Sequence, residues 1–275
     1  GRLSSSTTRP PRFPLALDQM GRGTSSAPKP REPLRPQRHL HEAARDARVM
    51  AAPQGLGLDS ALVRQRMVQR LRAEGIRCEP VFAAMGEVPR HHFVDTALAI
   101  QAYEDTSLPI GHGQTISKPS VVARMIELLF DGRSARDAGH LGRTLEVGTG
   151  CGYQTALLAR LARRVVSIER LRPLFDKAQV NLSAWRMDHV RLVFGDGMLG
   201  HPPNAPYDSL IAAAGGDELP AAWLDQLAVG GRLVAPMQRP GGRGQVLVVI
   251  DRREGGLVRT EHEAVHFVPL KSGTV

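Results

Sequence analysis

From residue 144 onward, short apolar runs alternate with segments in which apolar residues recur every three or four positions. The short runs predict buried strands, and the three-to-four spacing predicts amphipathic helices between them. Alternating strands and helices favour a parallel sheet that is covered on both faces. The last two runs follow one another without a helix, so we expect the sheet to end in an antiparallel hairpin. The expected strands are 144–147, 164–168, 190–194, 207–213, 232–236, 245–250 and 261–267, and the expected helices are 153–162, 173–185 and 219–227.

The segment before the sheet has helical character. Helices are expected over 60–73, 81–85 and 93–103. Two glycines and two prolines in 108–119 predict an ordered loop rather than a strand over 108–118, and Ser117 and Pro119 are start signals for a helix over 121–129. We therefore predict an α/β fold with a doubly wound, mainly parallel sheet and an N-terminal helical extension.

The most informative pattern is Thr144–Tyr153, where a buried strand breaks into a glycine-rich turn that opens a helix. Glycines at 148, 150 and 152 allow a tight turn and a close approach of backbone to a ligand. The next strand ends in Glu169, and an acid at that point can accept hydrogen bonds from both hydroxyls of a ribose. Strand, turn, helix, strand and acid together predict a nucleoside-binding unit.

The spacing of the glycines indicates which nucleoside is bound. A dinucleotide fingerprint is G-x-G-x-x-G, whereas this turn is G-x-G-x-G and follows Glu146, a carboxylate that would repel phosphate. S-adenosyl-L-methionine has a ribose, no phosphate and a cationic amino-acid end, and so fits better; its product is S-adenosyl-L-homocysteine. The residues expected to bind this cofactor are Glu146, Gly148, Thr149, Gly150, Gly152 and Glu169.

The loop Leu108–Pro119, with Pro109-Ile110-Gly111 and Gln114-Thr115-Ile116-Ser117, resembles the signature of protein-L-isoaspartate O-methyltransferases. Further segments resemble that family in the same order, and the resemblance covers roughly 59 to 273. These segments are Leu145–Leu158, Val166–Arg170, Gly195–Gly197 and Phe267–Leu270. The resemblance implies a Rossmann-like methyltransferase that transfers a methyl group to the α-carboxyl of L-isoaspartyl residues in damaged proteins and thereby initiates their repair.

The resemblance also implies residue roles. Ser117 corresponds to the active-site serine of the family, and we expect Thr115 to assist it in holding the acceptor carboxylate. Asp196 is implied as an acceptor for the adenine amino group, beside Gly197. The chain departs from the family at Gly215-Gly216, where we expect a more flexible loop.

Two alternatives stay open at this level. The chain could be a methyltransferase for RNA or a small molecule, with a basic extension as a nucleic-acid arm. It could also be a catalytically silent protein that binds the cofactor without turnover.

Charge divides the chain into two parts. Residues 1–57 contain ten basic and four acidic residues, a net +6 that leaves only +3 of the total +9 for the remainder. This segment is rich in Pro, Arg and Ser, so we expect a disordered extension followed by a methyltransferase domain over 58–275.

The composition also limits which cofactors and partners we expect for this chain. Two cysteines make no disulfide framework, which is typical of a cytoplasmic protein. No apolar run reaches the length of a membrane span, and the ten histidines show no metal-ligand spacing. We expect a monomer that acts on isoaspartyl peptides and proteins, without a metal, a membrane or a nucleic acid as partner.

Overall fold

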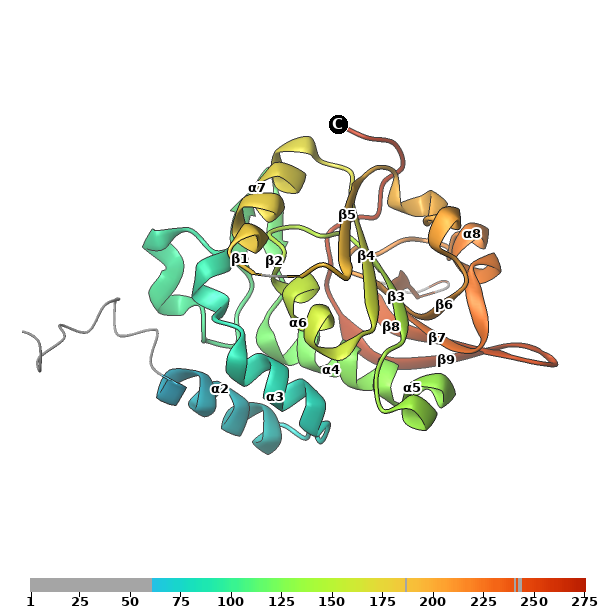
Figure 1. Cartoon of the computed structure of the whole chain (residues 1–275), viewed down its shortest axis with the longest axis horizontal. Helices are drawn as coiled ribbons and strands as arrows, with labels where there is room; N and C mark the ends of the chain where they lie inside the picture. The colour runs from blue at the N-terminus through green and yellow to red at the C-terminus, as the bar shows by residue number, and fades with distance from the viewer. Residues whose placement is uncertain (1–60, 186, 240, 242–243) are drawn as a thin grey trace, which may run out of the picture. The chain divides into compact units, whose positions relative to one another are not determined.

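Seven strands form the central sheet of the computed structural model, in the order β5-β4-β3-β6-β7-β8-β9 (Figure 1). The strands are β3 (Arg143–Val147), β4 (Arg164–Glu169), β5 (Val190–Phe194), β6 (Tyr207–Ala212), β7 (Leu227–Gln238), β8 (Gln245–Arg253) and β9 (Gly256–Val265). The first five strands in this order, β5, β4, β3, β6 and β7, run parallel to one another. β8 pairs antiparallel with both β7 and β9. The predicted mainly parallel sheet with an antiparallel end is confirmed. The structure describes 61–275 except 186, 240 and 242–243, so the predicted extension over 1–57 lies outside the described residues.

Alternation along the strands creates two apolar layers, because successive side chains of a strand point to opposite faces. Leu210 and Ala212 of β6 pack in one layer with the buried Trp223, whereas Ile211 between them belongs to the other layer. Trp223 lies in α8 (Ala221–Asp225), which covers the first face. The second face carries the larger core. The helices that pack in it come before β3 in the chain or connect consecutive parallel strands.

The helices of the larger layer include the predicted N-terminal extension. They are α2 (Ala61–Ala73), α3 (Glu79–Glu87), α4 (Pro119–Phe130), α5 (Arg133–Ala138), α6 (Tyr153–Leu161) and α7 (Arg172–Ser183). Both α2 and α3 pack on α4, and α3 also packs on α6 (Figure 1). The extension therefore supports the two helices whose first residues follow the predicted acceptor loop and the glycine turn.

The segment 108–118 forms a hairpin, so its prediction as a loop is wrong. β1 (Leu108–Gly111) pairs antiparallel with β2 (Gln114–Ile116). The turn places Gly111, His112 and Gly113 at φ of 99°, 54° and 68°, which two glycines tolerate without strain. Strand pairing here depends on the burial of Leu108, Ile110 and Ile116 against the core, which local composition does not reveal.

Other boundaries differ as well. The helix expected over 93–103 is two short 3₁₀ turns, η2 (Arg90–Phe93) and η3 (Thr96–Gln101). The expected helix 219–227 is shorter, since Pro220 precedes its first turn and the chain enters β7 at Leu227. α5 was not expected, because six residues are too few to show a helical period.

The expected flexible loop at Gly215-Gly216 is instead a buried and bonded segment. Gly215 N donates to Val268 O at 2.8 Å and its oxygen accepts from Leu270 N at 2.8 Å, while Gly216 O accepts from Gln238 N at 2.9 Å. Both glycines are buried. Gly215 lacks a side chain because Gln245 occupies the space where a Cβ would lie. The segment is therefore packed and not flexible.

Gly215→Ala should destabilise the fold. A Cβ at this position would lie 2.3 Å from Nε2 of Gln245, whose amide is fixed by two bonds to the backbone of Phe267. We expect the free energy of unfolding to fall by about 1–3 kcal/mol, measured by urea denaturation. Gly86→Ala in α3 is the matched control, because a Cβ there meets nothing within 4 Å and alanine is the better helix former. Equal stabilities of the two variants would contradict this account.

Candidate active site

A cavity of about 530 Å³ lies at the carboxyl ends of β3 and β4. The strand order reverses between β3 and β6, and such a switch point is where open α/β sheets bind ligands. Its walls come from the β1–β2 hairpin, the glycine turn, the end of β4 and the C-terminal segment. Of the predicted site residues, Thr115, Ser117, Gly148, Thr149, Gly150, Glu169 and Gly197 line this cavity.

The glycine turn connects β3 to α6 and presents bare backbone to the cavity. Gly148, Gly150 and Gly152 have φ of 94°, 57° and 92°, values that L side chains rarely adopt. The amides of Gly148 and Thr149 both donate to Ile168 O of β4, at 2.8 and 3.2 Å. The turn is thereby fixed to the sheet, and a ligand can approach the backbone of Gly148 and Gly150 directly.

Glu169, the last residue of β4, is 5% exposed and lines the cavity. Its Oε2 accepts from Gly150 N and its Oε1 from Leu171 N, both at 2.9 Å. Each oxygen of an ionised carboxylate can accept a further hydrogen bond. The side chain therefore both holds the glycine turn and offers acceptor sites for a pair of hydroxyls.

Glu146, which was expected to bind the cofactor, is not among the residues that line the cavity. The carboxylate is fully buried beneath α6 and accepts from Thr155 Oγ1 at 2.5 Å, Ser167 Oγ at 2.6 Å and Gln154 Nε2 at 3.1 Å. Burial raises its pKa from 4.5 to about 7, against the opposing effect of these three hydrogen bonds. Glu146 therefore joins β3 to β4 and to the start of α6.

Asp196 and Gly152 are likewise outside the cavity lining. Oδ1 of Asp196 accepts from Met198 N at 2.9 Å, and its Oδ2 accepts from Gly273 N at 2.6 Å. An aspartate that precedes a helical turn commonly bonds to its own backbone in this way. Gly152 is the N-cap of α6 and packs against Leu182, which a Cβ would approach to 3.1 Å.

A second cavity of about 770 Å³ adjoins the first. The two share Thr115, Ser117, Ala213 and Val268 in their linings. Ser117 is half-buried at the exit of the hairpin, directly before α4. A group bound in the second cavity can thus meet a ligand of the first beside the hydroxyl of Ser117.

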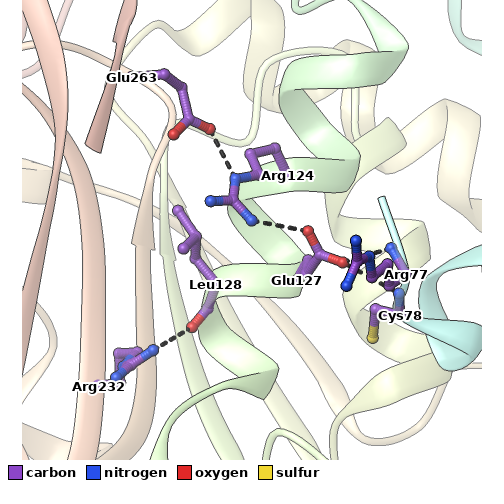
Figure 2. A network of polar contacts seen from close by, with 7 residues as sticks. All are labelled: Arg77, Cys78, Arg124, Glu127, Leu128, Arg232 and Glu263. Atoms are coloured by element: carbon purple, nitrogen blue, oxygen red, sulfur yellow. Dashed lines mark hydrogen bonds and ion pairs between the residues drawn. The ribbon is translucent and has the colours of Figure 1, made fainter. Parts of the chain in front are cut away.

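An arginine-centred network frames the second cavity (Figure 2). Arg124 of α4 donates to Glu263 of β9 at 2.7 Å and to Glu127 at 2.9 Å. The other oxygen of Glu127 accepts from the amides of Arg77 and Cys78, at 2.6 and 3.1 Å. Three walls of the cavity, from α4, β9 and the turn before α3, are thereby held together.

The sequence analysis did not identify this frame. The i, i+3 spacing of Arg124 and Glu127 was the only local signal, and nothing local pointed to Glu263. Val268, Pro269 and Leu270 also line the first cavity; they belonged to a recognised motif but had not been predicted as site residues.

Other site types find no support in the part of the chain that the structure describes. There, no group of three His, Cys, Asp or Glu side chains could hold a metal ion. Cys78 and Cys151 are free thiols. None of the helices within 61–275 has the length and apolarity needed to span a membrane.

A glycine-lined cavity at the switch point, with an acid at the end of the second strand and a sheet that ends antiparallel, defines a nucleoside-binding α/β enzyme of the methyltransferase type. Residues 62–275 match the family model for protein-L-isoaspartate(D-aspartate) O-methyltransferase. The chain belongs to this family, as its resemblance predicted.

Individual relatives agree with the family model. The chain is 63% identical to a protein-L-isoaspartate O-methyltransferase of Methylibium petroleiphilum, over 99% of this chain and 100% of the relative. It is 57% identical to the protein of that name from Leptothrix cholodnii, over 98% of each.

Two solved structures share the fold. One is a protein-L-isoaspartate O-methyltransferase that is 28% identical, with a TM-score of 0.67, covering 76% of this chain and 66% of that one. The other is a Plasmodium falciparum structure described as a complex with S-adenosyl-L-homocysteine; it is 24% identical, with a TM-score of 0.66, covering 76% of this chain and 98% of that one.

Stability should depend on pH through Glu146. Its folded pKa of about 7 lies above the ordinary value of 4.5, so the folded state keeps a proton that the unfolded state loses as pH rises between these values. The free energy of unfolding should fall across this window by an amount on the order of 3 kcal/mol, and remain reduced above it. Urea denaturation from pH 5 to 8 on the wild type and Glu146→Gln should show this fall in the wild type alone.

Glu218→Gln is the control, because this carboxylate is exposed and lines neither cavity. Its pH profile should follow the wild type. Identical profiles for the wild type and Glu146→Gln would show that the buried carboxylate does not titrate in this range.

Proposed function

We propose that this enzyme transfers a methyl group from S-adenosyl-L-methionine to the α-carboxyl of L-isoaspartyl residues in damaged proteins and so initiates their repair. One observation carries the proposal. Ser117, in the stretch that resembles the family signature, lies on the boundary shared by the glycine-lined cavity and the larger second cavity. Cofactor and acceptor can therefore reach the same hydroxyl from opposite sides.

The residues of the first cavity fit the cofactor. Glu169 would hold the ribose, and the backbone of Gly148, Thr149 and Gly150 would contact the amino-acid end. Gly197 also lines this cavity and packs tightly on β3, because a Cβ there would lie 2.4 Å from Val147 Cγ1. We keep Glu146 and Asp196 as indirect contributors that hold the glycine turn and the C-terminal segment in place.

Bound S-adenosylmethionine supplies a methyl group on a positively charged sulfur. The acceptor carboxylate is ionised at neutral pH, so the protein has no proton to remove. Its task is to orient the carboxylate, and fixed orientation lowers the barrier of such two-partner reactions by roughly 7–11 kcal/mol. The hydroxyl of Ser117 would hold one carboxylate oxygen, with Thr115 beside it, and leave the other oxygen facing the cofactor cavity.

The second cavity would receive the peptide that carries the isoaspartyl residue. Its lining carries Lys118 and Arg124 as well as Glu74 and Glu263, and Arg124 is paired with Glu263. A mixed lining of this kind suits a peptide backbone better than a polyanion such as RNA, whose binding needs several unpaired cations.

The remaining assignments belong to the same proposal. The proposal assigns the catalytic domain to 58–275 and takes the enzyme to act as a monomer. The two free thiols suit a reducing, cytoplasmic compartment.

The direct test compares acceptors. The protein is incubated with labelled S-adenosylmethionine and either an isoaspartyl peptide or its aspartyl twin of the same sequence. Base-labile label on the isoaspartyl peptide alone supports the proposal. Transfer to RNA, or cofactor binding with no transfer to the isoaspartyl peptide, would contradict it.

Glu169→Gln should weaken S-adenosylhomocysteine binding by at least about tenfold. The substitution removes the charge from a group proposed to accept two hydroxyl hydrogen bonds, and each charge-assisted bond contributes about 1.5–3 kcal/mol. Calorimetric titration measures the affinity, with Glu218→Gln as the matched control. Unchanged affinity in a folded Glu169→Gln protein would exclude the ribose placement.

Ser117→Ala should lower kcat on isoaspartyl peptide by roughly 10- to 100-fold, because a small misplacement of the acceptor is costly. Affinity for S-adenosylhomocysteine should stay near the wild-type value. The pH profile of kcat should be flat above the acceptor's own titration near pH ~4, since no general base takes part. Ser183→Ala is the control, because that hydroxyl bonds Val180 O at the end of α7, away from both cavities.

Normal turnover in the folded Ser117→Ala protein would contradict the orienting role of the hydroxyl. Within the described residues, the structure offers Ser117 no capping role to explain such a result, because the N-cap of α4 is Lys118, whose side chain makes no capping hydrogen bond.

A further inference from the structure

Arg90 is a fully buried arginine that the proposed chemistry leaves without a role. Its Nε donates to Ala102 O at 2.7 Å and its Nη2 donates to Ser117 O at 2.8 Å. Its Cζ lies 4.9 Å from the centre of the Tyr153 ring. One guanidinium therefore contacts the end of η3, the residue that closes the acceptor hairpin and the first residue of α6.

These contacts join the two halves of the site. Tyr153 directly follows the glycine turn and lines the cofactor cavity, and Ser117 lines both cavities. The planar fork of arginine can hold two carbonyls at fixed angles while its face rests on an aromatic ring. Arg90 of η2 thus links Ser117 directly to the residue that follows the glycine turn.

Burial of this charge is costly, which argues against a role in packing alone. None of the ion pairs among the described residues includes Arg90, and Asp105, whose charge acts on the guanidinium, pairs with Lys118 instead. Burial lowers the pKa of the Arg90 guanidinium. Nη1 of Arg90 and Oη of Tyr153 are buried atoms without a hydrogen-bond partner in that part of the chain. An apolar side chain would fill this space without the desolvation penalty of a charge.

We infer that Arg90 is a positioning residue for methyl transfer, which fixes Ser117 through its carbonyl and sets the distance between the acceptor hairpin and the glycine turn. This inference rests on the proposed function of Ser117. Lys177 of α7 also holds the hairpin, because its Nζ donates to Ile110 O of β1 at 3.1 Å. The hairpin is thus held from two sides: Lys177 bonds to β1, and Arg90 bonds to Ser117, the residue directly after β2.

A double-mutant cycle on kcat tests the inference. Arg90→Met, which keeps an apolar stem, should lower kcat on isoaspartyl peptide by at least about tenfold. If Arg90 acts through Ser117, Arg90→Met added to Ser117→Ala should lower kcat by no more than about threefold further. A purely structural residue would give the full loss again in the double variant, and additive losses would overturn the inference.

Two further variants are measured, one as a second test and one as a control. Arg90→Lys keeps the charge but cannot hold both carbonyls, so it should show the same non-additive loss in kcat even if Arg90→Met fails to fold. Arg252→Met is the matched control, because Arg252 also donates to a carbonyl, Leu224 O at 2.6 Å, but lines neither cavity; it should keep the wild-type kcat.

Hydrogen exchange provides a readout that does not depend on the acceptor. In the presence of S-adenosylhomocysteine, Arg90→Lys should raise amide exchange across 108–117 while the amides of β3, β4 and β6 stay protected. Unchanged exchange in the hairpin would overturn the inference. A wild-type protein inactive on isoaspartyl peptide would contradict the proposed function instead, and the exchange result would still decide the role of Arg90.

Discussion

The site depends on one buried carboxylate beneath the glycine turn. Glu146 of β3 accepts hydrogen bonds from Ser167 of β4 and from Gln154 and Thr155 of α6. Because an unsatisfied acceptor would be costly at this depth, the three donors must be in place whenever the chain is folded. Their positions fix the start of α6 over β3 and β4. The glycine turn, which connects β3 to α6, is therefore fixed at both of its ends.

Two carboxylates of the same type acquire different tasks through their depth. Glu146 precedes the end of its strand and points under α6, where solvent and ligand cannot reach it. Glu169 is the last residue of β4, so its side chain emerges at the edge of the sheet and lines the cavity. Strand position therefore decides which acid supports the structure and which can meet a ligand.

The second cavity, proposed to receive the methyl acceptor, is assembled in a different way from the glycine turn. It is built from segments far apart in the chain, joined by arginines: Arg124 links α4 to β9, and Arg90 links η2 to the hairpin and to α6. A guanidinium can serve several partners at once because its donors lie in a plane and point in different directions. The cofactor side has its glycine turn and Glu169 in the stretch from β3 to the end of β4, and the hairpin and the C-terminal segment complete its lining.

The sequence by itself predicted the βαβ unit, the glycine turn and an acid at the end of the second strand, because each rests on periodicity or on motifs confined to neighbouring residues. Only the tertiary structure decided that Glu146 lies behind the turn, that Asp196 binds backbone amides, and that Gly215 is packed rather than flexible. It also decided that 108–118 forms a hairpin and that Glu263 faces Arg124. The physical reason is that the direction and burial of a side chain are set by partners distant in sequence, and no local pattern encodes those partners.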